Sequence, residues 1–201
     1  MIKIYFLNYK MTQNNLNIVG ITGFKRSGKD TAGSILIQNG YTKYSFAGPL
    51  KKACQEIFMF NYEQTEGSKK EDFDDRWDTT PRKIFQRFGT EIFRNNLKLI
   101  LPNKDLHENF WIYRFKLWYQ EQIKTNPNLK VVVTDVRFPN EADIIKELGG
   151  TIIKVIRSET NLNNDQHSSE VSITKIQPDF TIYNNSTIHE YHSQIKKIFN
   201  L

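Results

Sequence analysis

The stretch GFKRSGKDT, residues 23–31, decides the fold, because it matches the phosphate-binding loop pattern G-x-x-x-x-G-K-[ST] at every position but the last. That last position normally supplies a hydroxyl group to Mg²⁺, and here it is Asp30. Residues 16–22 (LNIVGIT) are apolar and β-branched and predict a buried parallel strand, while residues 29–39 space their apolar side chains as a helix does. Phosphate binding requires this strand–loop–helix context, because backbone N–H groups and a helix N-terminus favour an anion.

Further apolar runs predict four more strands, over residues 42–46, 130–134, 151–156 and 179–183. Helical patterns lie between and after them, over residues 50–60, from 81 onward, and over 110–123, 139–148 and 188–199. Thr80 followed by Pro81 predicts a helix start. The spacing in that helix predicts a core-facing side made of Ile84, Phe85, Phe88 and Ile92. Alternation of strands and helices predicts the α/β class with a parallel, doubly wound sheet.

The bulk composition fits one folding unit that binds a nucleotide. The 201 residues carry a net charge of +6, and 22 acidic residues are mixed among 28 basic ones, which suits a small anionic ligand better than a nucleic acid. A single cysteine, Cys54, cannot form an internal disulfide, so we expect it to be packed in a protein of the reducing cytosol. No segment has the length of a membrane span, so we expect a soluble protein.

The first residues allow two interpretations. Residues 1–15 are interpreted as an N-terminal extension: either Met11 is the true start, which leaves the first ten residues outside the domain, or IKIYFL adds an edge strand. The sequence alone does not separate the two.

The loop supplies the first candidate site. Lys29 is expected to neutralise the β- and γ-phosphates of a nucleotide, and Lys25 and Arg26 add two cations, at least one of which we interpret as solvated surface charge. Asp30 is placed to hold hydrated Mg²⁺ through water, or alternatively to pair with Lys25 or Arg26. Thr31 offers a hydroxyl group beside it.

A second candidate site follows the strand at residues 130–134. Asp135 stands where a metal or acceptor is bound in open α/β sheets, and Arg137 offers a fork that matches a phosphate. The alternative is an ordinary surface ion pair. Trp111 and Phe46 either stack on a nucleobase or belong to the core.

A looser set of cations comprises Lys51, Arg76, Arg82 and Arg94, each of which is alternatively a solvated helix residue. The polar loop after Arg157 (SETNLNNDQHSSE) is interpreted as a lid.

Taken together, the motifs resemble one known family. GFKRSGKDT, YSFAGPLK, RKIFQRFGTEIFR, FW at residues 110–111, TDVRFPNEAD, GGTIIKVIR, HSSE and DFTIYNNS occur in the order found in the deoxynucleoside monophosphate kinases of bacteriophages and large DNA viruses, in which GKD replaces GK[ST]. The resemblance runs from Val19 to the C-terminus. It implies a three-layer, P-loop NTP hydrolase-like fold with a central, mainly parallel sheet, a helical lobe that binds the monophosphate (about 47–125) and a lid (about 158–177).

The resemblance also implies roles by position. Catalysis would involve Lys25, Lys29, Asp135 and Arg137. The donor ATP would be bound by Arg26, Ser27, Gly28, Lys29, Asp30, Thr31 and Arg157, with Asp30 also holding the metal, directly or through water. The deoxynucleoside monophosphate would be bound by Lys25, Leu50, Lys51, Arg76, Arg82, Gly89, Trp111, Asp135, Arg137, Asn140 and Glu141. The chain is shorter than the phage pattern between AGPLK and RKIFQ, so the role assigned to Arg76 depends on the match of one short segment, DDRW.

The implied reaction is transfer of the γ-phosphoryl group of ATP, with Mg²⁺, to a deoxynucleoside monophosphate for deoxynucleotide supply in DNA synthesis. The expected partners are therefore the two nucleotides, with no stable nucleic-acid partner, no membrane and a homodimer as an open option, in the cytoplasm of the host if the protein is viral. Two alternatives stay open. Animal-type phosphomevalonate kinases also carry a GKD loop and a GPLK segment, and a non-catalytic nucleotide-binding module would use the loop only to sense ATP.

Overall fold

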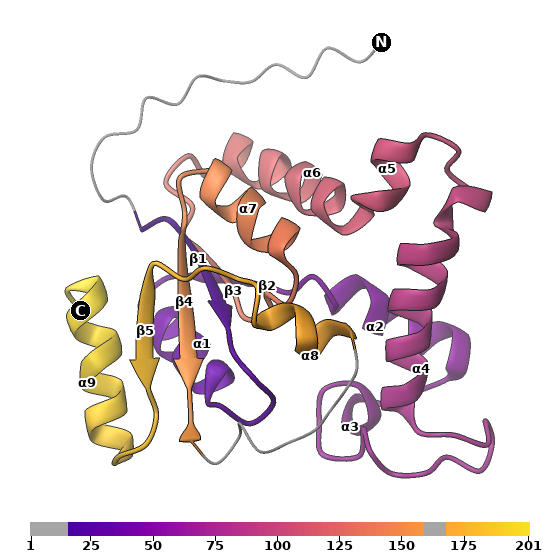
Figure 1. Ribbon diagram of the computed structural model, residues 1–201, viewed down its shortest axis with the longest axis horizontal. Coiled ribbons are helices and arrows are strands. Elements are labelled where there is room, and N and C mark those ends of the chain that lie inside the picture. Colours follow the sequence, from indigo (N-terminus) through magenta and orange to yellow (C-terminus); the bar gives the residue numbers. More distant parts are fainter. Residues whose placement is uncertain (1–15, 159–167) are drawn as a thin grey trace.

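A computed structural model describes residues 16–158 and 168–201 and shows a five-stranded, fully parallel sheet in the order β2-β3-β1-β4-β5 (Figure 1). The strands are β1 (Ile18–Thr22), β2 (Thr42–Tyr44), β3 (Val131–Val133), β4 (Thr151–Ile156) and β5 (Phe180–Tyr183). β1 lies at the centre, where Gly20 pairs with Val133 on one side and Ile152 on the other. The predicted α/β class and all five predicted strands are confirmed.

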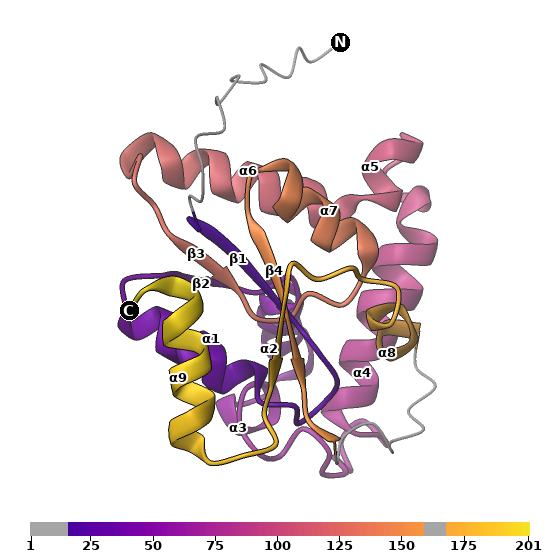
Figure 2. The same ribbon diagram turned by 60° about the vertical axis from the view of Figure 1, so that its left-hand side comes forward.

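Helices cover both faces of the sheet and make three layers (Figure 2). α1 (Lys29–Gln38) and α9 (Ile188–Phe199) pack on one face, and α6 (Phe110–Thr125) and α7 (Pro139–Glu147) on the other. Successive strand residues point to opposite faces of the sheet. Val19 therefore packs in the core beneath α1 and α9, and Ile18 packs in the core beneath α6 and α7. Because β1 and β3 run parallel, their carboxyl ends meet at one edge, which brings the loop after β1 beside the residues that follow β3.

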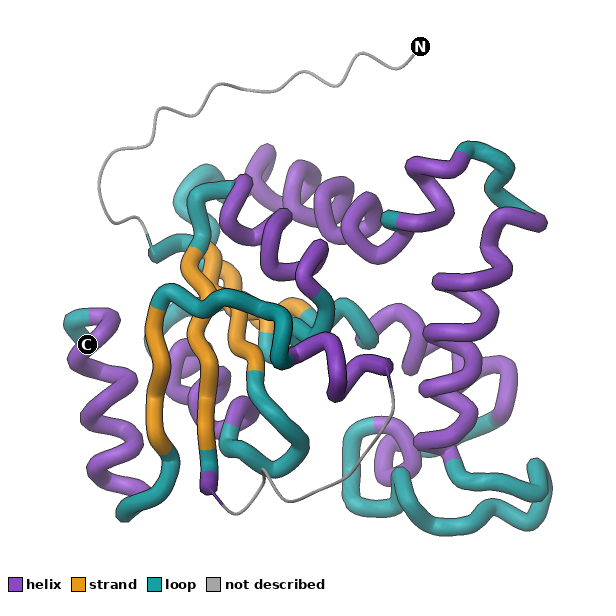
Figure 3. Tube along the Cα trace, viewed as in Figure 1, coloured by secondary structure: helices purple, strands orange, loops and turns teal. Residues whose placement is uncertain are grey.

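The segment between β2 and β3 builds a helical lobe beside the sheet (Figure 3). It contains α2 (Gly48–Phe58), α3 (Tyr62–Thr65), α4 (Pro81–Arg87), a π-helix η1 (Phe88–Asn96), η2 (Leu97–Leu99) and α5 (Lys104–Glu108) before α6 begins. Aromatic rings join its parts: Phe58 contacts Phe88, and Phe88 contacts Phe93, which contacts Trp111. Cys54 is a buried free thiol within α2, as expected.

One core prediction in this lobe is wrong. Thr80 caps α4, accepting a hydrogen bond from the Lys83 N–H (3.3 Å), as the sequence predicts. Ile92, however, is 43% exposed, and Phe93 packs against the core in its place. The cause is η1, because the wider turns of a π-helix rotate later side chains away from the positions that α-helical spacing predicts.

Two other expectations fall partly or wholly outside the described residues. The alternatives for residues 1–15 lie outside them, as do residues 159–167 of the expected lid; the structure describes Ser158, α8 (Ser168–Ile173) and residues 174–177. Within the described ranges, no helix combines the length and apolar character needed to cross a membrane.

Candidate active site

The phosphate-binding loop turns between β1 and α1 on backbone conformations that glycine permits. Gly23 and Gly28 have φ angles of 146° and 106°, and Arg26 adopts a left-handed φ of 64°. A Cβ atom at Gly23 would collide with the carbonyl oxygen of Val155, and one at Gly28 would collide with the side-chain amide of Asn184. Glycine is therefore needed at both positions for conformation and for space.

Two side chains from the end of the chain hold this loop. Asn184, just after β5, donates from Nδ2 to the Ser27 carbonyl (2.9 Å), and Tyr191 on α9 donates from its hydroxyl to the Gly28 carbonyl (2.9 Å). Tyr191 is fully buried, and burial raises the pKa of its phenol. The sequence analysis assigned neither residue to the site: Asn184 occurs there only within the motif DFTIYNNS, and Tyr191 carries no signal beyond an apolar helix position.

The interior of the loop contains polar groups suited to a phosphate. Lys29 donates from Nζ to the Phe24 carbonyl (2.6 Å), which places its ammonium group across the loop. The hydroxyl groups of Ser27 and Thr22 are buried and have no hydrogen-bond partner within the described structure. Buried hydroxyl groups are normally satisfied, so these two fit a loop that is completed by phosphate oxygens.

A pocket of about 560 Å³ opens beside the loop. Its volume is in the range of small-molecule sites. Its lining joins the loop to the segments after β4 and β5, and consists of Arg26, Gly28, Asp30, Thr31, Arg157, Ser158, Asn184, Asn185, Ser186 and Ile188. Five of the predicted ATP-binding residues therefore meet here, and the segment 184–188 joins them without having been predicted.

Asp30 is exposed in the first turn of α1, where a carboxylate is favoured by the helix dipole. It makes no ion pair with Lys25 or Arg26, so the pairing alternative is not what the structure shows. No group of three or more His, Cys, Asp or Glu side chains suited to a metal occurs in the described part of the chain. A single carboxylate fits Mg²⁺ held mainly by water and phosphate oxygens.

Asp135, directly beyond β3, binds the turn that links β2 to α2. Its Oδ2 accepts from the Ser45 hydroxyl (2.7 Å) and the Ala47 N–H (2.9 Å), and its Oδ1 accepts from the Phe46 N–H (2.9 Å). Both carboxylate oxygens are thus engaged, and the surface-pair alternative with Arg137 is not observed. Asp135 thereby fixes the point from which α2 begins.

Glu141 performs a similar task for Arg137. It is 2% exposed, and its Oε2 accepts from the backbone N–H groups of Arg137 (2.9 Å) and Phe138 (3.1 Å) at the start of α7. Asn140 donates to the Asn109 side chain (3.3 Å), which links α7 to the start of α6. The contacts of Glu141 fix the backbone at Arg137 and Phe138, and so fix the point from which the Arg137 side chain extends.

Cations from the loop and the lobe face one another across acidic residues. Glu71 Oε1 lies 2.5 Å from Lys25 Nζ and 3.5 Å from Arg82 Nε, so one carboxylate bridges the phosphate-binding loop and α4. Burial opposes ionisation of Glu71, but the hydrogen bond from Lys25 and the charge of Arg82 outweigh it and lower its pKa. Lys51 on α2 pairs with Glu66 (2.9 Å). The sequence analysis assigned no role to Glu66 or Glu71.

Comparison with known proteins decides the family. The sequence profile described as deoxynucleotide monophosphate kinase matches residues 17–76 and 55–195. The chain belongs to this family.

Two relatives, one from a mimivirus and one from a phage, agree with that assignment. A protein of Acanthamoeba polyphaga mimivirus, to which the same kinase activity is attributed, is 47% identical over 183 residues, which cover 89% of this chain and 93% of the relative. The deoxynucleotide monophosphate kinase of Enterobacteria phage T4 is 22% identical over 90% of this chain and 98% of its own length. Dephospho-CoA kinase from Campylobacter jejuni is a similar solved structure, with a TM-score of 0.45, 18% identity, and coverage of 92% of this chain and 96% of that chain.

Several residues that the family resemblance assigns to the monophosphate are packed in this kinase. Trp111 and Phe46 are buried in the hydrophobic core, so the core interpretation of both is confirmed. Leu50 is buried as well, and a Cβ atom at Gly89 would lie 2.9 Å from its Cδ2. Gly89 therefore lets η1 approach α2 closely, which shapes the wall of the lobe.

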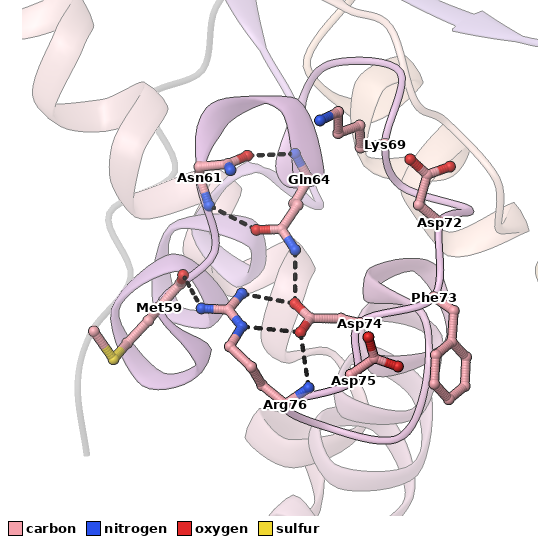
Figure 4. Close-up of a pocket in the computed structure, with 9 residues that line it drawn as sticks. All are labelled: Met59, Asn61, Gln64, Lys69, Asp72, Phe73, Asp74, Asp75 and Arg76. Atoms are coloured by element: carbon pink, nitrogen blue, oxygen red, sulfur yellow. Dashed lines mark hydrogen bonds and ion pairs between the residues drawn. The ribbon is translucent and has the colours of Figure 1, made fainter.

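Arg76 lies apart from the other assigned cations. Its guanidinium group binds Asp74 through Nε (2.9 Å) and Nη2 (2.7 Å) and the Met59 carbonyl through Nη1 (3.4 Å) (Figure 4). Asp74 is buried, also accepts from Gln64 (2.7 Å), and has its pKa lowered to about 2, chiefly by the hydrogen bond from Arg76. These residues line a separate pocket of about 470 Å³ within the lobe, together with Asn61, Lys69, Asp72, Phe73 and Asp75. The structure does not bring Arg76 together with Lys25 and Arg82.

Proposed function

We propose that this kinase transfers the γ-phosphoryl group of ATP directly to the 5′-phosphate of a deoxynucleoside monophosphate. The observation that carries the proposal is the position of Lys25: it belongs to the donor loop, yet its ammonium group is joined through Glu71 to Arg82 of the lobe. A cation shared in this way is suited to two phosphates that must be brought together for transfer. The family assignment favours the nucleotide over phosphomevalonate as acceptor, and catalysis over mere ATP sensing.

The donor side is supported by the loop and the pocket beside it. The N–H groups of the loop, the unsatisfied hydroxyl groups and Lys29 would bind the β- and γ-phosphates, and the pocket lined by Arg157 and residues 184–188 would hold the nucleoside. Asp30 would hold Mg²⁺ through water, and the ion, when bound, supplies positive charge between the phosphates.

On the acceptor side, the residues that would bind the phosphate of the monophosphate are Lys25, Arg82 and Arg137. The second pKa of a phosphate monoester is about 6, so the acceptor is already largely dianionic at neutral pH and no general base is required. The task of the protein is to orient two anions and stabilise the charge that they share. Asp135 and Glu141 contribute by fixing the start of α2 and the backbone of Arg137.

A coupled ADP-release assay tests the proposal. It would use ATP and Mg²⁺ with dTMP, dGMP, dCMP, dAMP, the matching ribonucleotides and phosphomevalonate. We expect turnover on one or more deoxynucleotides, which would also supply the base specificity. Turnover on phosphomevalonate alone, or none on any acceptor by folded protein that binds ATP, would contradict the proposed acceptor.

The cellular setting of the reaction is also proposed. We place it in the cytoplasm of the infected host, on the basis of the viral and phage relatives and of the buried free thiol of Cys54, which suits a reducing compartment. Fractionation of infected cells with an antibody against the protein would test this.

A further inference from the structure

Residues 66–71 (EGSKKE), here called the strap, are tied to the active site at both ends. Glu66 pairs with Lys51 on α2 (2.9 Å), and Glu71 pairs with Lys25 in the phosphate-binding loop (2.5 Å). The backbone is fixed as well, because the Arg82 N–H donates to the Lys70 carbonyl (2.9 Å). The strap therefore spans from α2 to the donor loop, along the cations proposed to bind the acceptor phosphate.

Lys70 lies inside this span and differs from the other lysines there. Its side chain is half-buried, and it makes no hydrogen bond or ion pair with any described residue, whereas Lys25 and Lys51 each have a carboxylate partner. Burial is the main cause that lowers the pKa of Lys70, and repulsion from Lys51 and Arg82 adds to it. A partly desolvated ammonium group among other cations is unfavourable unless an anion is also bound.

The surroundings of Lys70 indicate where that anion would lie. Its attractive neighbours are Glu66 on the acceptor side and Asp30, in the first turn of α1, on the donor side. Lys51 and Arg82, which repel it, are proposed acceptor-site residues. The ion pairs of the strap and the hydrogen bond from the Arg82 N–H to the Lys70 carbonyl (2.9 Å) thus place Lys70 between α2 and the donor loop, the elements that would bind the two nucleotides.

We propose that Lys70 is a further catalytic residue whose ammonium group binds the phosphoryl group during its transfer, an inference that rests on the proposed function. In that step the bond between the γ-phosphorus and its bridging oxygen breaks, a bond from the acceptor phosphate oxygen to the same phosphorus forms, and the electron pair leaves with ADP. No proton moves, and Lys70 remains protonated. It supplies positive charge where the equatorial oxygens carry negative charge.

The chain contains a matched control in the adjacent residue. Lys69 is exposed and lines the pocket of Arg76 and Asp74 (Figure 4). It carries the same charge on the same backbone segment, but water solvates it. Lys69 and Lys70 are the same residue type, and only the fold makes them different, because it exposes Lys69 and half-buries Lys70.

The test compares Lys70→Met, Lys70→Arg and Lys69→Met in the full-length protein, with the thermal midpoint measured for each. Removing one charge-stabilising donor from a site of this kind typically lowers kcat by about 100-fold or more, so we expect a loss of that size in Lys70→Met and KM values for both nucleotides within about threefold of the wild type. The kcat of Lys70→Arg should exceed that of Lys70→Met by at least about tenfold, because the charge is retained. Lys69→Met should stay within about twofold of the wild type, and the thermal midpoints should be unchanged or raised.

A binding measurement supplies a readout independent of turnover. A bisubstrate analogue, in which an adenosine and a deoxynucleoside are joined by a phosphate chain, should bind Lys70→Met at least about tenfold more weakly in calorimetry, while the deoxynucleoside monophosphate alone binds nearly as before. Normal kcat or normal analogue affinity in Lys70→Met, or an equal loss in Lys69→Met, would overturn the inference while leaving the kinase assignment intact. Absence of deoxynucleotide turnover in the wild-type protein would instead remove the proposed function and this inference with it.

Discussion

The donor side and the acceptor side of this active site are built in different ways. The phosphate-binding loop is fixed by glycine conformations, by the parallel strands beneath it, and by buried hydrogen bonds from Asn184 and Tyr191. The acceptor side consists of long, partly exposed cations on the loop and the lobe, held by ion pairs with Glu66 and Glu71. The donor loop has its shape before ATP arrives, whereas the acceptor cations already hold carboxylates.

This difference has a chemical consequence. A phosphate that binds Lys25 and Arg82 brings negative charge next to Glu71, so the carboxylate must move or be repelled. The hydroxyl groups of Ser27 and Thr22 on the donor side require no such exchange, because they have no hydrogen-bond partner within the described structure. We therefore expect substitutions on the donor side to affect catalysis directly, and substitutions at the acceptor carboxylates to change how the monophosphate binds.

The largest effect should come from the donor loop. Lys29→Ala removes the ammonium group that lies across the loop, and kcat/KM should fall by about 1,000-fold or more, because charge stabilisation of the transferred group is lost. Circular dichroism and the thermal midpoint should show an intact fold. Near-normal turnover in the purified variant would refute the role given to Lys29.

Asp135→Asn tests the link between the two sides. The variant keeps the shape of the side chain but loses the charge and one acceptor for the Ser45 and Ala47 donors, so the start of α2 should loosen and kcat/KM for the monophosphate should fall by about 10- to 100-fold. The Mg²⁺ concentration that gives half-maximal rate should not change. A large shift in that concentration would show that Asp135 is a metal ligand instead of a residue that positions the turn.

Much of the donor side could be predicted from the sequence, because its signals are local. Strand, glycines, lysine and helix follow one another within residues 16–39. On the acceptor side, Asp135 and Arg137 could be predicted in the same way, because they follow a strand whose partner is β1. What the sequence could not show is which groups meet from distant parts of the chain. Tyr191 reaches Gly28 across most of the sequence, and nothing local marks an apolar helix position as a hydrogen-bond donor.

The lobe was harder to predict for a different reason. Helical spacing placed Ile92 in the core, but the π-helix changed the register, a feature with no reliable local signature. The stretch before α4 is polar and has few apolar side chains, yet it carries the strap. Glu71 pairs with Lys25 in the phosphate-binding loop, whereas the next residue, Asp72, lines the pocket around Arg76 and Asp74, and composition does not report that difference.

Glu71→Gln should sharpen the contrast on the acceptor side. The amide has no charge to compete with the incoming phosphate, so the KM for the monophosphate should fall about three- to tenfold while the KM for ATP stays constant. Asp72→Asn is the matched control, because it removes the same charge from the adjacent, exposed residue, which lines the pocket around Arg76 and Asp74. A raised KM in Glu71→Gln would mean that the carboxylate orients Lys25 and Arg82 for the substrate.

Tyr191→Phe should give the smallest effect, and its nature matters more than its size. The variant removes one buried hydrogen bond to the Gly28 carbonyl and leaves the ring packed, so the free energy of unfolding should fall by about 1 kcal/mol in urea titrations. Because Gly28 lies at the start of α1, next to Lys29, the KM for ATP should rise about two- to threefold while the KM for the monophosphate stays constant. An equal rise in both KM values would mean that the hydrogen bond supports the whole site. The donor loop and the lobe would then be coupled, although different residues hold them in place.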